Sequence, residues 1–142
     1  MKLLLAVDGS APSLAAVEAL AERLHWFRDP TELTLLHVHP AIPYKAAAAW
    51  AGHDAVARYY DEESDAALAA PRAKLDARGI RYAVEKRVGD PATEIVQCAT
   101  ANAMDLIVMG THGHSALANV VMGSVAARVL ALSSLPVLLL KR

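Results

Sequence analysis

Three glycines and a serine near the end of the chain have the types and spacing of an anion-binding loop. Gly110 and Gly113 follow an aliphatic run, and Gly123 directly precedes Ser124. Glycine lets backbone N–H groups approach a ligand closely, and the first N–H groups of a helix carry a partial positive charge. These residues therefore suit a phosphate group, to which the Ser124 hydroxyl would donate.

Asp8 stands at the end of another aliphatic run and precedes a Gly9-Ser10 turn. Its carboxylate can accept hydrogen bonds from ribose hydroxyls, or can hold a metal ion that is itself bound to phosphate. We expect no other metal role for Asp8 than through nucleotide-bound Mg²⁺. Val38, which ends a third aliphatic run, would flank a base.

Other interpretations of these residues stay open. The sequence contains neither GxxxxGK[ST] nor GxGxxG after its first aliphatic run, so the glycines could serve only to end a strand and admit close helix packing. The pairs His37-x-His39 and His112-x-His114 would each share one face of a strand, which makes a zinc clip conceivable. Neither pair has a Cys or carboxylate ligand close by, so packing or phosphate contact is favoured over metal binding.

Strand and helix patterns alternate along the chain and would position these residues. We predict five strands, over Lys2–Val7, Glu32–Val38, Ile80–Val88, Asp105–Met109 and Pro136–Leu140. We predict helices over Ala11–Phe27, over Asp54–Arg78, from Pro91 to about Asn102, and over Gly123–Leu132. Near-continuous aliphatic strands joined by helices are typical of a parallel sheet that is covered on both faces.

Right-handed crossovers leave few topologies for such a chain. We predict one α/β domain over residues 1–142, with a doubly wound, Rossmann-like five-stranded parallel sheet of order 3-2-1-4-5 and helices on both faces. The order reverses between the first and fourth strands, so the ligand crevice should lie beyond their carboxyl ends. That position selects Asp8 and the loop that follows Gly110.

Composition excludes several classes of protein. The 142 residues are 55% hydrophobic and 20% charged, which suits one folded domain. A net charge of −1 predicts no nucleic-acid partner, and no apolar run approaches the roughly 18 residues of a membrane span. The single cysteine, Cys98, cannot form an internal disulfide, so we expect a reducing, cytoplasmic location.

The last predicted strand has an unusually apolar edge. It carries no charge before Lys141, and as the fifth strand in the predicted order it would end the sheet. An exposed apolar edge favours pairing with another chain. We therefore predict a two-fold homodimer that joins the fifth strands through Val137, Leu138, Leu139 and Leu140.

No nucleophile with a neighbouring base and orienting acid emerges from the sequence, so we predict no catalytic residues. The leading hypothesis is a regulatory module that binds a nucleotide with little or no catalysis. One alternative is a slow ATPase or autokinase in which Asp8 holds Mg²⁺ and Ser124 is phosphorylated. Another is a dimerisation module that binds no nucleotide.

The spacing Gly110-x2-Gly113-x9-Gly123-Ser124 resembles the G-2x-G-9x-G-[S/T] signature of the nucleotide-binding branch of the universal stress protein family. The resemblance extends over nearly the whole chain, apart from residues 42–70. The segments that carry it are Leu4–Ser10, Leu36–Val38, Val88–Ala92, Asp105–Gly110 and Leu135–Leu140.

The resemblance implies a cytoplasmic stress-response protein that binds ATP, ADP or AMP, with or without Mg²⁺, and acts as a homodimer on an unknown regulatory partner. Ala6 and Val38 would lie near adenine and Asp8 near ribose, while the glycine loop and the following helix would hold the phosphates. The nucleotide-binding residues implied in this way are Ala6, Asp8, Val38, Met109, Gly110, Thr111, His112, Gly113, His114, Ser115, Gly123, Ser124 and Val125.

One departure from the family pattern concerns charge. Members that hold ATP often carry Lys or Arg in the loop after the second glycine, whereas residues 114–122 contain neither. Helix dipoles and N–H groups offset a triphosphate less well without a cation. We therefore expect weak or pH-dependent ATP binding through His114, with AMP or ADP as alternative ligands.

Overall fold

The aliphatic runs of the sequence form strands, and the amphipathic segments between them form helices. The computed structural model describes residues 1–27, 29–42, 52–113 and 122–141. Its strands are β1 (Lys2–Val7), β2 (Glu32–His39), β3 (Ala83–Val88), β4 (Leu106–Gly110) and β5 (Val137–Leu140). Its helices are α1 (Ala11–Arg23), a short 3-10 helix η1 (Leu24–Trp26), α3 (His53–Asp76), α4 (Pro91–Ala101) and α5 (Ser124–Leu132).

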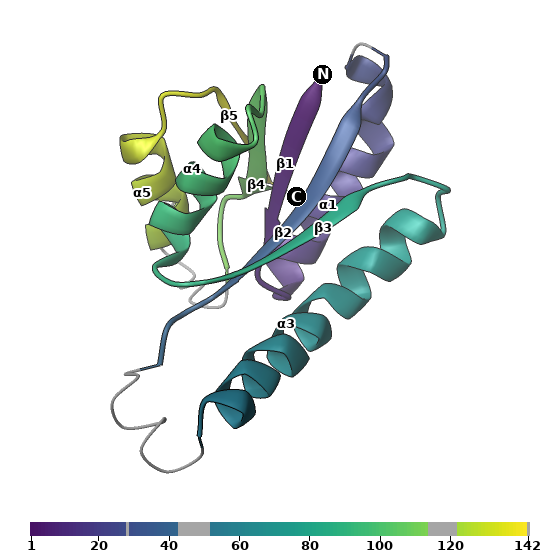
Figure 1. The fold of residues 1–142 in the computed structure, drawn as a ribbon. Coiled ribbons are helices and arrows are strands. Elements are labelled where there is room, and N and C mark those ends of the chain that lie inside the picture. Colours follow the sequence, from purple (N-terminus) through teal and green to yellow (C-terminus); the bar gives the residue numbers. More distant parts are fainter. Residues whose placement is uncertain (28, 43–51, 114–121, 142) are drawn as a thin grey trace.

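The five strands form one parallel sheet in the order β3-β2-β1-β4-β5, which confirms the predicted fold (Figure 1). The register places Val7 beside His37 and Ala6 beside Met109. Strand order reverses between β1 and β4, so the loops that follow these two strands leave the sheet in opposite directions. Asp8 begins one of these loops, and Thr111 begins the other.

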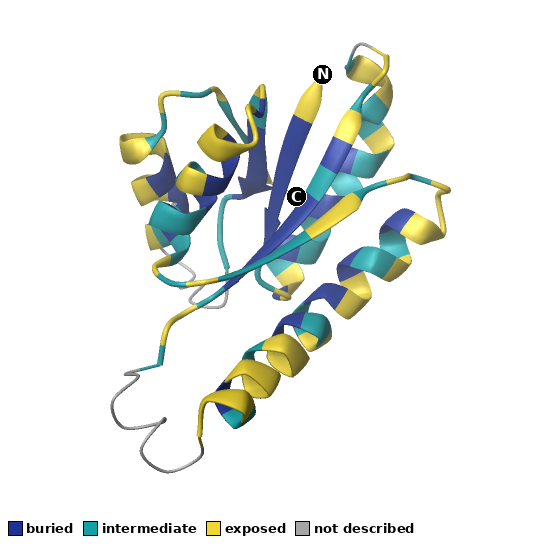
Figure 2. Cartoon of the chain, in the orientation of Figure 1, coloured by how far each residue is buried: buried dark blue, intermediate teal, exposed yellow. Residues whose placement is uncertain are grey.

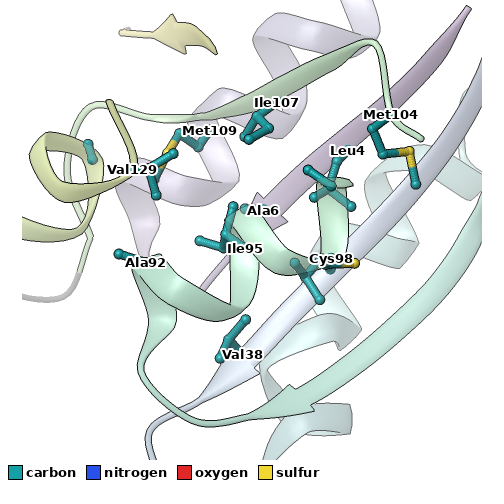
Figure 3. Packing of buried hydrophobic residues seen from close by; sticks show 13 residues of the cluster. Leu4, Ala6, Val38, Ala92, Ile95, Cys98, Met104, Ile107, Met109 and Val129 are labelled. Atoms are coloured by element: carbon teal, nitrogen blue, oxygen red, sulfur yellow. The ribbon is translucent and has the colours of Figure 1, made fainter. Parts of the chain in front are cut away.

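Two separate apolar cores cover the two faces of the sheet, because side chains alternate along each strand. On one face, Ala6 of β1 packs with Ile95 of α4 and Val129 of α5 (Figure 3). On the other face, Leu5 of β1 packs with α1 and with Leu68 of α3. Helices α4 and α5 therefore lie on one side of the sheet, and α1 and α3 lie on the other (Figure 1).

Two predicted boundaries were wrong by more than two residues. The third strand was expected from Ile80 but begins at Ala83, because the Ile80 N–H donates to the Leu75 carbonyl at 3.1 Å and completes the end of α3. Gly79, at φ 65°, turns the chain there. The first helix was expected to reach Phe27 but ends at Arg23, where η1 tightens the last turn.

The N-terminal half of α3 extends past the carboxyl ends of the strands, and most of its residues are exposed (Figure 2). This half of the helix stands beside the sheet edge at which the predicted site lies. Among the residues placed in the structure, none belongs to a helix both long enough and apolar enough to cross a membrane. Cys98 is a buried free thiol in the core beneath α4.

Candidate functional site

A cavity of about 510 Å³ lies at the carboxyl edge of the sheet, where the loops that follow β1 and β4 leave in opposite directions. Its wall is formed by the ends of β1, β2 and β4 and by residues of α1, α3, α4 and α5. This volume falls within the range of small-molecule sites. The sheet therefore presents a ligand-sized hollow at the position that its topology predicts.

Most residues predicted for nucleotide binding line this one cavity. Those that do so are Ala6, Asp8, Val38, Met109, Gly110, Thr111, His112, Gly113, Gly123, Ser124 and Val125. His114 and Ser115 lie outside the described residues, so their predicted contacts with phosphate stay predictions. The structure thus brings together segments that are more than 100 residues apart in the sequence.

The wall on the α4 and α5 side is largely apolar. Ala6 and Val38, which were predicted to lie near adenine, line it together with residues that were not predicted as site residues. These additional wall residues are Leu36, Pro91, Ile95 and Ala126. An apolar wall of this kind suits a flat aromatic group such as a base.

Asp8 is held by the first turn of α1. Its Oδ1 accepts hydrogen bonds from the Ser10 N–H at 3.0 Å and from the Ser10 hydroxyl at 2.6 Å. Its own N–H donates to Ser13 Oγ at 3.2 Å, and the Ser13 N–H donates to Ser10 Oγ at 3.3 Å, which caps α1. These bonds fix the carboxylate at the mouth of the cavity.

Two signature glycines lie in close contact with other residues around the cavity. A Cβ added at Gly113 would overlap Oδ2 of Asp8, so a side chain there would require the carboxylate or the loop after β4 to shift. A Cβ at Gly123 would lie 3.3 Å from both the His112 Cα and the Thr111 carbonyl oxygen, which is a tight contact. Glycine at these positions therefore allows backbone to come close without displacing its neighbours.

The first turn of α5 opens into the same cavity. The Gly123 N–H donates to the Thr111 carbonyl at 2.7 Å and ties the helix start to the loop after β4. Gly123 is the N-cap residue, and it has no side chain with which to cap the helix. The next three N–H groups, on Ser124, Val125 and Ala126, have no acceptor within the helix, and all three residues line the cavity.

The start of α4 is arranged differently. Asp90 is its N-cap and accepts hydrogen bonds from the N–H of Thr93 at 3.1 Å and from its hydroxyl at 2.6 Å. The guanidinium of Arg128 on α5 forms two further bonds to Asp90, at 2.6 and 3.0 Å. Hydrogen bonds from Arg128, and then from Thr93, lower the pKa of Asp90 to about 2.

Histidines line the α3 side of the cavity. His37 is buried, and its Nδ1 lies 3.0 Å from the Val7 carbonyl oxygen, which can only accept, so Nδ1 carries the proton. His39 lies edge-on to Tyr59 and Tyr60 at ring distances of 5.7 and 5.0 Å. Glu63, Ala66 and Ala67 of α3 also contribute to this wall, and no sequence pattern predicted them as site residues.

Two charge properties of the site bear on its ligand. Among the described residues that line the cavity, there are carboxylates from Asp8 and Glu63 but no Lys or Arg. Within the same described ranges, no group of three His, Cys, Asp or Glu side chains is placed to hold a metal ion. Anion binding here would therefore depend on backbone N–H groups rather than on lysine or arginine side chains.

Comparisons with known proteins agree with this geometry. The family model described as the universal stress protein family matches residues 1–141. The chain is 32% identical to universal stress protein MJ0531 of Methanocaldococcus jannaschii over 142 residues, which cover 99% of this chain and 82% of that protein.

Solved structures show the same likeness. The structure of MJ0577, from the same archaeon, has a TM-score of 0.78 and 27% identity and covers 99% of this chain and 95% of that one. A universal stress protein family protein from Arabidopsis thaliana, solved with AMP bound, has a TM-score of 0.65 and 23% identity, with 100% of this chain and 92% of that one covered. From its sequence match and its fold, the chain belongs to the universal stress protein family.

Proposed function

We propose that the cavity binds an adenine nucleotide and that the protein is a nucleotide-dependent regulator with little or no catalysis. The observation that carries this proposal is the convergence of Asp8, the signature glycines and the start of α5 on one cavity of about 510 Å³. The adenine would lie against the apolar wall on the α4 and α5 side, and the ribose hydroxyls would bond to the Asp8 carboxylate. The phosphates would accept hydrogen bonds from the loop after β4 and from the first turn of α5.

The residues present fit such a ligand. The glycine cradle leaves backbone where a Cβ would intrude, most severely at Gly113. The N–H groups of Ser124, Val125 and Ala126 would donate to anionic oxygens, and the Ser124 hydroxyl would add a further donor. If Mg²⁺ accompanies the nucleotide, it would neutralise phosphate charge, and Asp8 would hold it in place of the ribose hydroxyls.

The charge of the cavity favours ligands with few phosphates. With no Lys or Arg among its described lining residues, it offsets one phosphate more readily than three. We therefore propose that AMP binds more tightly than ATP at pH 8 in the absence of Mg²⁺. Histidine is the side chain that gains positive charge over this pH range, so the preference for AMP over ATP should be smaller at pH 6 than at pH 8.

Calorimetric titration with AMP, ADP and ATP at pH 6 and pH 8 tests this proposal, together with mass spectrometry of any ligand released from freshly purified protein. The expected result is binding of AMP and a preference for AMP over ATP that is larger at pH 8. Failure of all three nucleotides to bind would contradict the proposed function. Equally tight ATP binding at both pH values would contradict the role of histidines, including His114.

We also propose that the protein forms a two-fold dimer through β5. The two edges of the sheet differ in charge. At the β3 edge, Lys86 pairs with Asp61 at 2.6 Å and Arg87 pairs with Glu85 at 3.4 Å, whereas Val137–Leu140 of β5 contains only half-buried apolar residues. Charged residues oppose edge-to-edge pairing, and apolar ones favour it.

Strand geometry supplies a specific test of that dimer. The Pro136 carbonyl accepts from Ile107 of β4, and the Leu140 carbonyl accepts from Thr111, the residue that follows β4. Both polar groups of a residue in a parallel strand point the same way and successive residues alternate, so the N–H of Leu139 faces outward. Leu139→Pro should weaken the dimer at least about tenfold in analytical ultracentrifugation while β5 stays paired to β4. Leu139→Ala controls for loss of the side chain, and an unchanged dimer in Leu139→Pro would contradict pairing through β5.

A further inference from the structure

An ion pair joins Asp90, the N-cap of α4, to Arg128 in the second turn of α5, and these two helices form one wall of the cavity. Arg128 lies four residues after Ser124, so the two residues share one face of α5, and its side chain reaches back toward the first turn. Asp90 directly precedes Pro91, which lines the cavity from the start of α4. Neither Asp90 nor Arg128 is itself one of the described lining residues.

The geometry of this pair is more exact than that of most surface ion pairs. The two terminal guanidinium nitrogens of Arg128 bond to separate carboxylate oxygens of Asp90, at 2.6 and 3.0 Å. Oδ2 of that carboxylate is already held by the N–H and hydroxyl of Thr93. A bidentate contact to an anchored carboxylate restricts orientation as well as distance, so α5 is fixed relative to α4 just outside the cavity.

Beneath the ion pair, α4 and α5 share one apolar core. Ala92 of α4 and Ala126 of α5 belong to this core and are almost fully buried, and Ile95 of α4 and Val129 of α5 pack in it as well. Apolar packing restricts distance more than direction, whereas hydrogen bonds depend on direction. The polar pair therefore adds a directional link between α4 and α5 to the bond that ties Gly123 to the Thr111 carbonyl.

We propose that Asp90 and Arg128 are positioning residues that set the affinity of the cavity for the phosphate part of its ligand. This inference rests on the proposed function. The pair would act by aligning the N–H groups of Ser124, Val125 and Ala126 with the phosphate oxygens, and it would leave contacts with the base unchanged. A hydrogen-bond donor contributes fully only when it is aimed at its acceptor.

The direction in which AMP affinity changes in Asp90→Asn distinguishes a positioning role from a purely electrostatic one. If Asp90 influenced phosphate only through its charge, Asp90→Asn would remove a nearby negative charge and strengthen AMP binding. If Asp90 acts by positioning, the same substitution weakens AMP binding, because the bond to Arg128 loses its charge. Asn remains a good N-cap residue and can still accept from the Thr93 N–H, so α4 should keep its start.

The experiment measures the dissociation constants of adenosine and of AMP. The adenosine value divided by the AMP value isolates the contribution of the phosphate to binding. Asp90→Asn and Arg128→Gln should each lower this ratio about three- to tenfold, the range expected when an anion loses alignment with a helix N-terminus. The double variant should lose no more than either single variant, because each breaks the same link. Arg78→Gln, which breaks an exposed ion pair between the turn after α3 and Glu22 of α1, is the matched control and should leave the ratio unchanged.

A second readout requires no ligand. Amide hydrogen exchange in Asp90→Asn should become faster at Ala127, whose N–H donates to the Gly123 carbonyl at 3.0 Å, and at the residues of α5 that follow it, while exchange at the start of α4 stays unchanged. If the ratio of the adenosine to the AMP dissociation constant is unchanged or raised in Asp90→Asn, the positioning role is overturned and the proposed function is left intact. A wild-type protein that binds neither adenosine nor AMP would overturn the proposed function itself, and unaltered exchange in α5 would separately overturn the link between the helices.

Discussion

Helices α4 and α5 begin side by side at the same edge of the sheet, but only α4 has a side chain that accepts hydrogen bonds from the N–H groups of its first turn. The start of α4 is occupied by the protein's own carboxylate, Asp90, which accepts from Thr93. The start of α5 has Gly123 as its N-cap, and its next residues line the cavity. Both turns carry the same partial positive charge.

This difference teaches how one fold can use identical backbone electrostatics for stability in one place and for binding in another. A carboxylate at an N-cap lowers the energy of the helix and neutralises its dipole. A glycine leaves the dipole and the N–H groups available to a ligand, provided that neighbouring backbone can come close. The residue at the N-cap therefore decides which of the two roles a helix start takes.

The substitution with the largest expected effect on binding is Gly113→Ala, in the loop that adjoins the open helix start. The new Cβ would overlap the Asp8 carboxylate and force either that carboxylate or the loop after β4 to shift. We expect AMP affinity to fall by about one to two orders of magnitude, the loss expected when a hydrogen bond that involves a charged group is broken. Calorimetric titration of the variant against wild type measures the loss.

Gly79→Ala is the control for glycine loss as such. Gly79 has φ 65° and nothing within 4 Å of an added Cβ, and it lies at the end of α3. Alanine there should reduce the free energy of unfolding by about 1 kcal/mol through backbone strain, with AMP affinity unchanged. If Gly113→Ala lost no more affinity than Gly79→Ala, the close approach to Asp8 would have no part in binding.

A more direct test gives α5 the kind of cap that α4 has. Gly123→Asp would place a carboxylate at its first turn, where it would compete with phosphate for the same N–H groups. We expect AMP affinity about tenfold lower in Gly123→Asp than in Gly123→Asn, which has nearly the same shape without the charge. Adenosine affinity should be equal in the two variants, and equal AMP affinities would refute the assignment of phosphate to this helix start.

The smallest expected effect concerns the contribution of Asp90, the N-cap of α4, to the thermal stability of the protein. The pKa of Asp90 is lowered from 3.8 to about 2 in the folded protein, so its ionised form stabilises the fold above about pH 4, and that contribution is lost as the pH falls toward 2. Arg128→Gln removes the largest cause of this shift. The variant should melt about 1–3 °C below wild type at pH 7, since both groups are partly exposed, and the gap should close by about pH 2. Melting curves followed by circular dichroism measure the gap, and one that widened in acid would contradict the assignment.

The sequence was sufficient for the sheet and its order, because the aliphatic runs are nearly unbroken and their alternation with helices limits the topology. The error at the start of β3 has a physical cause. Ile80 and Tyr82 are apolar and pack against the core, yet Ile80 belongs to the end of α3 through its bond to Leu75. Apolar character indicates burial, but it does not reveal which backbone partner a residue takes.

The candidate site was predictable only where residue types restrict backbone geometry. Glycines and an aspartate at strand ends marked the polar side of the cavity. Pro91 was predicted only as a helix start, and neither it nor Ile95 was predicted to line the cavity, because apolar residues in a helix resemble those of any core. Arg128 could not be paired with Asp90 from the sequence, since 38 residues separate them and only the packing of α4 against α5 brings them together.

An AMP titration followed by amide NMR tests the central claim most directly, because it observes the backbone groups that are held to bind phosphate. The account predicts that the amide signals of Gly113 and of Ser124, Val125 and Ala126 shift with AMP and shift much less with adenosine. Phosphate-dependent shifts confined to the shallow surface around Arg72 and Tyr82, with the first turn of α5 unaffected, would contradict it.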